Sequence, residues 1–141
     1  MSKYAFVTGG SRGIGRAVCV KLAQMGFCVV INYVSNDEAA QETLRLVQEV
    51  GGSGELLKFD VADTDASVKA ITGWQESHPD NYVEVLVNNA GVRKDNLLLW
   101  LEPEDWFKVV STDLNSFYNV TRPFLQPMVS HRNVRIARHW F

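Results

Sequence analysis

Short apolar runs alternate along the chain with stretches of helical periodicity, and this alternation restricts the fold more than any other feature of the sequence. The apolar runs occupy 4–7, 27–33, 56–61 and 83–87. Helical spacing of apolar residues follows each run, over 14–25, 35–50, 63–77 and 103–120. Strands that alternate with helices in this way are parallel and are joined by right-handed crossovers. The sequence therefore predicts an α/β fold with a doubly wound parallel sheet, in a single domain over 1–141.

Composition and charge exclude several classes of protein. The 141 residues are 46% hydrophobic and 21% charged, and 14 basic side chains against 16 acidic ones give a net charge of −2. These values are typical of a globular domain, and so small a charge creates no general attraction for nucleic acid or a membrane surface. The first apolar run is too short for a secretory signal, and no stretch approaches the roughly 20 residues that cross a bilayer. We expect a cytoplasmic chain with no nucleic-acid or membrane partner.

The cysteines and histidines do not suggest a metal or a disulfide. Cys19 and Cys28 lie in apolar segments without the paired spacing that redox and metal sites use, so we expect free, buried thiols. His78, His131 and His139 have no acidic or thiol partner at ligand spacing. No metal is expected.

A glycine-rich segment joins the first predicted strand to the first predicted helix. It reads Thr8-Gly9-Gly10-Ser11-Arg12-Gly13-Ile14-Gly15. In a dinucleotide-binding turn, Gly9 would allow the sharp turn, Gly13 the approach of the backbone to a pyrophosphate, and Gly15 close packing of the helix. The helix N-terminus would offer its N–H groups to the anion. A glycine cluster can also be a plain structural turn, and this alternative stays open on the turn alone.

A second motif, Asn88-Asn89-Ala90-Gly91, ends the fourth predicted strand. Together with 8–15 it closely resembles the two N-terminal signatures of the short-chain dehydrogenase/reductases. The loop 92–98 and the following Glu104-Asp105-Trp106 resemble the bacterial 3-oxoacyl-acyl-carrier-protein reductases in particular. The resemblance covers about residues 3–136. It implies a Rossmann-like fold and the NADP(H)-dependent reduction of a 3-oxoacyl thioester to the 3-hydroxyacyl thioester in fatty acid synthesis.

The end of the second strand bears on the choice between NAD(H) and NADP(H). NAD-binding folds carry a carboxylate about 20 residues past the glycines, which binds the ribose 2′-OH. Asp37 stands 22 residues past Gly15, but it falls inside the segment 35–38, which reads as a helix capping box begun by Ser35. The strand end from Asn32 to Ser35 is neutral and would admit a 2′-phosphate, with Arg12 as its charged partner. We favour NADP(H), and Arg12 as a solvated loop cation is the alternative.

The resemblance implies further cofactor contacts at the ends of the third and fourth strands. Asp60 and Val61 would contact adenine, although Asp60 can also simply cap a turn. Asn88, Ala90 and Gly91 would lie beneath the adenosine and its ribose. For Asn88 and Asn89, a role in holding the sheet together is an equal alternative.

The proton-donating part of the family's site is absent from this sequence. The resemblance implies a tyrosine with a lysine four residues later, and a serine. Thr8, Asp37, Leu86 and Arg122 stand four residues after the four tyrosines. Tyr118 is expected to pack in the core. The family's helix asparagine stands seven residues after Trp106, where this chain has Asp113, for which a structural polar role is the alternative.

The resemblance also implies that the chain ends early, after the fourth strand and the long helix that follows it. Past Ile136 the sequence no longer matches the family, and we expect a truncated or frameshifted product without a fifth strand. Such a chain is expected to be inactive alone. The second function class is therefore a non-catalytic fragment that binds nucleotide or associates with a reductase.

Partners follow from the same resemblance. The family forms homo-oligomers, tetramers in the related reductases, through the long helix represented by 106–120. Arg132 and Arg135 are candidates for contact with the acidic acyl carrier protein, and a solvated helix face is the alternative. Trp74, Trp100 and Trp106 are expected to pack.

Overall fold

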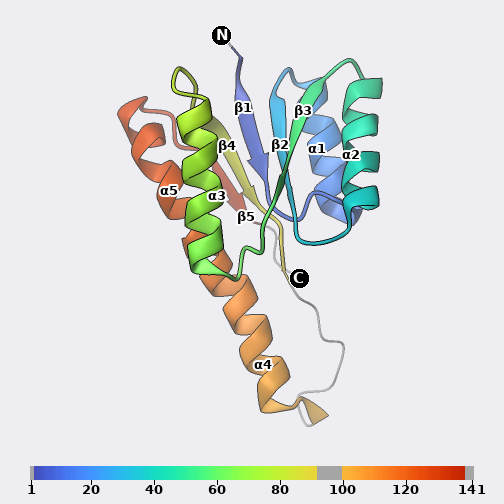
Figure 1. Ribbon diagram of the computed structural model, residues 1–141, viewed down its shortest axis with the longest axis vertical. Helices are drawn as coiled ribbons and strands as arrows, with labels where there is room; N and C mark the ends of the chain where they lie inside the picture. The colour runs from blue at the N-terminus through green and yellow to red at the C-terminus, as the bar shows by residue number, and fades with distance from the viewer. Residues whose placement is uncertain (1, 92–99, 139–141) are drawn as a thin grey trace.

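The computed structural model describes residues 2–91 and 100–138, which form a parallel sheet between two layers of helices (Figure 1). Its strands are β1 (Tyr4–Val7), β2 (Cys28–Tyr33), β3 (Ser53–Lys58), β4 (Val83–Asn88) and β5 (Ile136–Arg138). Its helices are α1 (Gly13–Gln24), α2 (Asp37–Glu49), α3 (Thr64–Ser77), α4 (Pro103–Val110), the π-helical turn η2 (Ser111–Asn115) and α5 (Ser116–Ser130). The predicted alternation of strands and helices is confirmed.

The strand order is β3-β2-β1-β4-β5, and every pair is parallel. The order reverses direction at β1, because β2 lies on one side of it and β4 on the other. A doubly wound sheet binds ligands beyond the carboxyl ends of its strands at such a reversal. The turn after β1 and the end of β4 lie there, so the fold brings both sequence motifs to the same edge.

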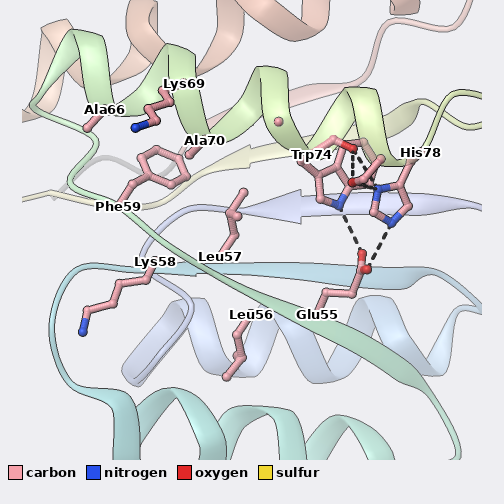
Figure 2. A pocket seen from close by; sticks show the side chains of 12 residues that line it. Glu55, Leu56, Leu57, Lys58, Phe59, Ala66, Lys69, Ala70, Trp74 and His78 are labelled. Atoms are coloured by element: carbon pink, nitrogen blue, oxygen red, sulfur yellow. Dashed lines mark hydrogen bonds and ion pairs between the residues drawn. The ribbon is translucent and has the colours of Figure 1, made fainter.

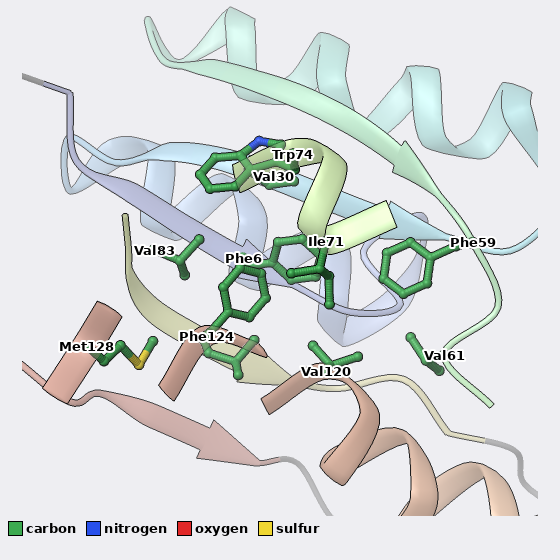
Figure 3. Close-up of a cluster of buried hydrophobic side chains, with 11 residues drawn as sticks. Phe6, Val30, Phe59, Val61, Ile71, Trp74, Val83, Val120, Phe124 and Met128 are labelled. Carbon is green, nitrogen blue, oxygen red and sulfur yellow. The ribbon is translucent and has the colours of Figure 1, made fainter. Parts of the chain in front are cut away.

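Two hydrophobic cores cover the two faces of the sheet. The core beneath α3 and α5 contains the residues drawn in Figure 3, among them Phe6, Ile71 and Phe124. The ring of Phe124 lies 4.9 Å from that of Phe6, centroid to centroid. The core beneath α1 and α2 contains Cys19 and Val29 among others. Alternate residues of β1 and β2 therefore point to opposite cores, as expected for strands covered on both faces.

A fifth strand is the main correction to the sequence-based fold. β5 pairs with β4 in parallel, with Leu86 opposite Ile136 and Asn88 opposite Arg138, and the N–H of Leu86 donates to the carbonyl of Arg135 (2.9 Å). The prediction that the sheet ends after its fourth strand was therefore wrong. Three residues are too few to show a strand periodicity, and the pairing depends on the backbone edge that β4 offers.

The third strand and the second helix begin at other residues than predicted. β3 spans Ser53–Lys58 rather than 56–61, because its polar first half is held by pairing with β2 at the edge of the sheet. Ser35 does not cap α2. The cap is Asn36, whose side-chain oxygen accepts the N–H of Ala39 (3.0 Å). The predicted cap of α3 is confirmed, since Asp63 accepts the N–H of Ala66 (3.0 Å).

The long helix after β4 is divided, and its tryptophans do not pack as predicted. Pro103 is at its first turn, as predicted, but η2 separates α4 from α5. Figure 1 shows α4 extending beyond the end of the sheet. Trp100 is 64% exposed, Trp106 51% and Tyr118 60%, whereas Trp74 is buried. The core position predicted for Tyr118 was therefore wrong, and Trp100 and Trp106, which were expected to pack, are largely exposed. α4 contains no buried residue, because it lies beyond the sheet on which its apolar side would pack. No helix in the described ranges is long and apolar enough to span a bilayer.

Candidate functional site

The turn between β1 and α1 is held at the carboxyl edge of the sheet by its own backbone. Gly9 and Gly13 adopt left-handed φ values of 63° and 57°, which favour glycine. The N–H of Thr8 donates to Val87 on β4 (3.0 Å), and the N–H of Gly10 donates to Asn32 on β2 (2.9 Å). The turn therefore lies between the two strands that flank β1, with its conformation determined by both.

Gly15 is the most crowded glycine of this turn. A Cβ there would overlap the carbonyl oxygen of Gly9 and lie 2.5 Å from Nδ2 of Asn89. A Cβ at Gly10 would lie 2.8 Å from Ile31 and 2.9 Å from the thiol of Cys19. The close helix packing expected at Gly15 is confirmed. Cys19 is buried in the core beneath α1 and α2, and this burial raises the pKa of its thiol to about 12. Both cysteines are free, as predicted, but Cys28 is only half-buried.

The two sequence motifs contact each other directly, although 80 residues separate Gly9 from Asn89. The hydroxyl of Thr8 accepts the N–H groups of Asn89 (3.0 Å) and Ala90 (2.9 Å). In return, Nδ2 of Asn89 donates to the carbonyls of Thr8 (3.3 Å) and Gly9 (3.0 Å). Asn88 donates to the hydroxyl of Thr121 on α5 (3.1 Å). These bonds support the structural alternative for Asn88 and Asn89. The fold needs both side chains to join the turn, β4 and α5.

Asn32 lies beneath the turn with its side chain wholly engaged. Its oxygen accepts the N–H of Gly9 (3.2 Å), and its nitrogen donates to the carbonyls of Leu57 (3.3 Å) and Phe59 (3.1 Å). The side chain is fully buried. Ser35 and Arg12, by contrast, are exposed at the same edge. Of the residues predicted to line the 2′ position, Ser35 and Arg12 can reach a ligand with their side chains, while Asn32 supports the turn from below.

Asp37, the carboxylate at the distance typical of NAD-binding folds, is engaged by two neighbours. The hydroxyl of Tyr33 donates to its Oδ1 (2.8 Å), and Nζ of Lys58 lies 3.2 Å from the same atom. The Tyr33 hydrogen bond and then the Lys58 contact lower the pKa of this carboxyl. Asp37, the first residue of α2, is thus ionised and paired with Lys58.

The predicted adenine contacts differ in exposure. Asp60 is exposed, and its Oδ1 accepts the N–H of Ala62 (2.9 Å). Asp60 therefore makes the turn-capping bond that was the alternative to adenine contact. Val61 is 2% exposed and belongs to the core beneath α3 and α5. Its carbonyl accepts Nδ2 of Asn119 (3.0 Å), and Oδ1 of Asn119 accepts the hydroxyl of Thr64 (3.1 Å). Asn119, which the sequence analysis missed, ties α5 to the segment that carries both residues.

Arg16 is the second residue that the sequence analysis missed. Its Nη2 donates to the carbonyls of Ser11 (2.6 Å) and Ala39 (3.0 Å), and its Nε donates to the hydroxyl of Thr43 (3.0 Å). That hydroxyl donates to the carbonyl of Gly10 (2.9 Å). One guanidinium therefore joins the glycine turn to α2. In the sequence, Arg16 appears only as a cation next to Gly15. A basic residue on a solvent-exposed helix looks the same.

Comparison with known proteins identifies the family of this chain. The family model described as short chain dehydrogenase matches residues 3–138. The chain belongs to the short-chain dehydrogenase family. The 3-oxoacyl-[acyl-carrier-protein] reductase FabG of Aggregatibacter actinomycetemcomitans is 39% identical over 132 residues, which are 94% of this chain and 54% of the relative. An acetoacetyl-CoA reductase of Rhizobium meliloti (strain 1021) is 40% identical over 128 residues, 91% of this chain and 50% of the relative.

A solved structure agrees with this assignment. The crystal structure of a metagenomic short-chain oxidoreductase in complex with NADP matches with a TM-score of 0.87 and 31% identity, over 96% of this chain and 61% of that one. The predicted family and the doubly wound, Rossmann-like sheet are confirmed. This short-chain dehydrogenase chain spans about half the length of the curated relatives it matches.

The remaining predicted residues of the short-chain dehydrogenase site lie away from the turn or outside the described ranges. Asp113 is half-buried in η2. Arg132 and Arg135 are exposed beyond the end of α5, and Arg132 has a left-handed φ of 54°. Gly91 is exposed at the end of the described segment 2–91, and the loop 92–98 lies outside the described residues. Within the described ranges no three His, Cys, Asp or Glu side chains are grouped to hold a metal ion, and His139 lies outside them.

A groove of about 650 Å³ lies between β3 and α3, away from the glycine turn (Figure 2). At one end, Glu55 accepts the indole N–H of Trp74 (3.1 Å) and lies 3.1 Å from Nε2 of His78. The rings of Trp74 and His78 stack at 4.3 Å. None of the predicted cofactor residues lines this groove, so it is separate from the candidate site.

Proposed function

We propose that this chain forms the cofactor-binding part of an NADP(H)-dependent reductase that converts a 3-oxoacyl thioester to the 3-hydroxyacyl thioester, a reaction of fatty acid synthesis. The observation that carries the proposal is the direct bonding of the glycine turn to Asn89 and Ala90 at the carboxyl edge of the sheet. The relatives support it through their names, which specify 3-oxoacyl and acetoacetyl thioesters, and one solved relative holds NADP. When bound, the nicotinamide of NADPH supplies the hydride that reduces a keto group.

The turn fits a phosphate-bearing cofactor. A side-chain cap is present at the N-termini of α2 and α3, through Asn36 and Asp63, but not at that of α1. The first N–H groups of α1 are therefore available to an anion, which the helix dipole also favours. Gly13 adds no obstruction, since even a Cβ there would meet no atom within 4 Å. Phosphate oxygens can approach the backbone at this point.

Two charged groups support NADP(H) over NAD(H). Arg12 is exposed at the start of α1, and in the described part of the chain it has no ion-pair partner. Asp37 already accepts from Tyr33 and pairs with Lys58, and both would compete with a ribose hydroxyl for its carboxylate. An unpaired guanidinium favours a 2′-phosphate, which it can bind through two charge-assisted hydrogen bonds.

Replacing Arg12 with alanine is expected to weaken NADPH binding about tenfold to hundredfold, because hydrogen bonds between charged groups contribute about 1.5–3 kcal/mol. NADH lacks the 2′-phosphate, so its affinities for the parent chain and for Arg12→Ala should differ by no more than about twofold. Titration calorimetry with each cofactor measures the effect. Arg45→Ala is the matched control, since it removes an exposed guanidinium from α2, where Arg45 pairs with Glu42 and Glu49. Equal affinity of the parent chain for NADPH and NADH would contradict the NADP(H) assignment.

Binding without turnover is the expected behaviour of the 141-residue chain itself. No tyrosine in the sequence is followed four residues later by a lysine, so the chain lacks the pair that would donate the proton. With acetoacetyl-CoA and NADPH, we expect NADPH to bind and its absorbance to stay constant. This result also fits the second candidate function, a non-catalytic nucleotide-binding fragment. Oxidation of NADPH by the purified chain would show that other residues supply the acid.

We further propose that a second copy of the chain covers the exposed apolar face of α4, η2 and α5, in a homo-oligomer such as the tetramer that the related reductases imply. The residues of this face are Trp106, Phe107, Leu114, Tyr118, Leu125 and Val129, all at least 37% exposed. Exposed large apolar side chains gathered along consecutive helices are typical of an interaction site. Arg132 and Arg135 lie exposed beyond α5, and their contact with an acyl carrier protein stays a prediction.

Replacing Phe107 with glutamate is expected to shift the chain toward the 15.9 kDa monomer. Aromatic residues at the centre of an interface contribute about 2 kcal/mol or more, so the association constant should fall at least about thirtyfold. Light scattering after size-exclusion chromatography, at equal concentrations of both proteins, measures the change. Val68→Glu, at an exposed position on α3, should leave the mass of the parent assembly unchanged. A parent chain that is monomeric at high concentration would exclude this interface.

A further inference from the structure

The carbonyl groups of the glycine turn are held on the side that faces α2. The hydroxyl of Thr43, which is fully buried, donates to the carbonyl of Gly10, and Nη2 of Arg16 donates to the carbonyl of Ser11. Arg16 also bonds the hydroxyl of Thr43 and the carbonyl of Ala39, so its guanidinium has partners on α2 as well as in the turn. Figure 1 shows α1 and α2 side by side on this face of the sheet.

The orientation of these carbonyls determines where the adjacent N–H groups point. In a trans peptide the C=O and the N–H point in opposite directions, and the described chain has no cis peptide bond. The carbonyl of Gly10 shares its peptide group with the N–H of Ser11, and the carbonyl of Ser11 shares its own with the N–H of Arg12. Both N–H groups therefore point away from α2. Within 2–91 and 100–138 neither N–H has an acceptor.

We propose that Arg16, acting with Thr43, is a positioning residue for the cofactor: it holds the peptide groups after Gly10 and Ser11 so that their N–H groups face the phosphate groups of NADP(H). This inference rests on the proposed function. Arg16 does not touch the ligand in this arrangement. It acts through the two peptide groups, and it makes their orientation depend on the position of α2, the helix that follows the strand end at which the cofactor is selected.

Thr43→Val is the sharpest test because it removes one hydroxyl without changing charge or shape. Valine leaves the carbonyl of Gly10 and Nε of Arg16 without their partner, and we expect NADPH to bind about three- to fivefold more weakly. Thr43→Ser keeps the hydroxyl and should restore affinity to within about twofold of the parent. A residue with a merely structural role would lower stability in both variants without separating their affinities.

Arg16→Lys keeps the charge but loses the planar set of donors, since an ammonium cannot reproduce the fork of a guanidinium. We expect about tenfold weaker NADPH binding for this variant. Lys21→Met is the control, because it removes an exposed charge from the other end of α1. Its affinity for NADPH should stay within about twofold of the parent's. Urea unfolding of every variant identifies any loss that comes from unfolded protein.

Backbone ¹⁵N relaxation separates this inference from the proposed function, because it needs no cofactor. In Thr43→Val and Arg16→Lys we expect the order parameters of Ser11 and Arg12 to fall from about 0.85 toward 0.6, with those of α1 unchanged. If the parent binds NADPH and both variants bind it within twofold, the inference is overturned. If the parent does not bind NADPH, the proposed function fails. The order parameters then decide alone, and unchanged values at Ser11 and Arg12 would overturn the inference.

Discussion

Replacing Gly15 with alanine is expected to destabilise the chain by about 3 kcal/mol or more and to abolish NADPH binding. The added methyl group would overlap the carbonyl oxygen of Gly9 and lie 2.5 Å from Nδ2 of Asn89. Both atoms belong to the bonded contact between the turn and the end of β4, so neither can move without breaking hydrogen bonds. Urea unfolding followed by tryptophan fluorescence gives the stability, and calorimetry gives the affinity.

Gly73→Ala is the matched control for this substitution. Gly73 lies inside α3, and a Cβ there would meet no atom within 4 Å. Alanine has a higher helix propensity than glycine, so we expect stabilisation by about 0.5–1 kcal/mol and unchanged cofactor binding. A Gly15→Ala variant as stable as Gly73→Ala would show that the turn is not packed as described.

Replacing Phe124 with alanine is expected to destabilise the chain by about 3–5 kcal/mol. The side chain is 1% exposed and packs against Phe6, Val120 and other residues of the core beneath α3 and α5 (Figure 3). The substitution leaves a cavity that rigid neighbours cannot fill. Because α5 also carries Thr121, the partner of Asn88, the loss should reach the end of β4.

One measurement with a control variant checks this second expectation. Urea unfolding gives the change in stability, at one protein concentration, so that self-association contributes equally to both proteins. Met25→Ala, at a 62% exposed position after α1, should cost less than about 1 kcal/mol. A loss of similar size in both variants would mean that α5 does not pack on the sheet as the structure shows.

The candidate site could be predicted in part because its motifs are local. Gly9, Gly13 and Gly15 are needed by backbone geometry and close packing, and those requirements appear in the sequence as glycine at a fixed spacing after a strand. Asn32 and Arg16 gave no such signal. Their roles come from bonds to residues more than twenty positions away, such as Asn32 to Leu57 and Arg16 to Thr43. A polar residue read alone does not reveal a partner that distant.

The amino-acid sequence by itself determined the alternation of strands and helices, the parallel sheet, the glycine turn and the family, because these depend on periodicity and on residues close together in the chain. Only the tertiary structure decided the fifth strand, the polar start of β3, and the exposure of Trp106 and Tyr118. β5 and β3 exist because a neighbouring strand offers its backbone edge, and hydrogen bonds to a backbone require no particular side chain. Trp106 is exposed because α4 extends beyond the end of the sheet and contains no buried residue, and apolar spacing in a helix does not show where the sheet beneath it ends. Tyr118 lies on α5 outside the buried side that Asn119, Val120 and Phe124 form.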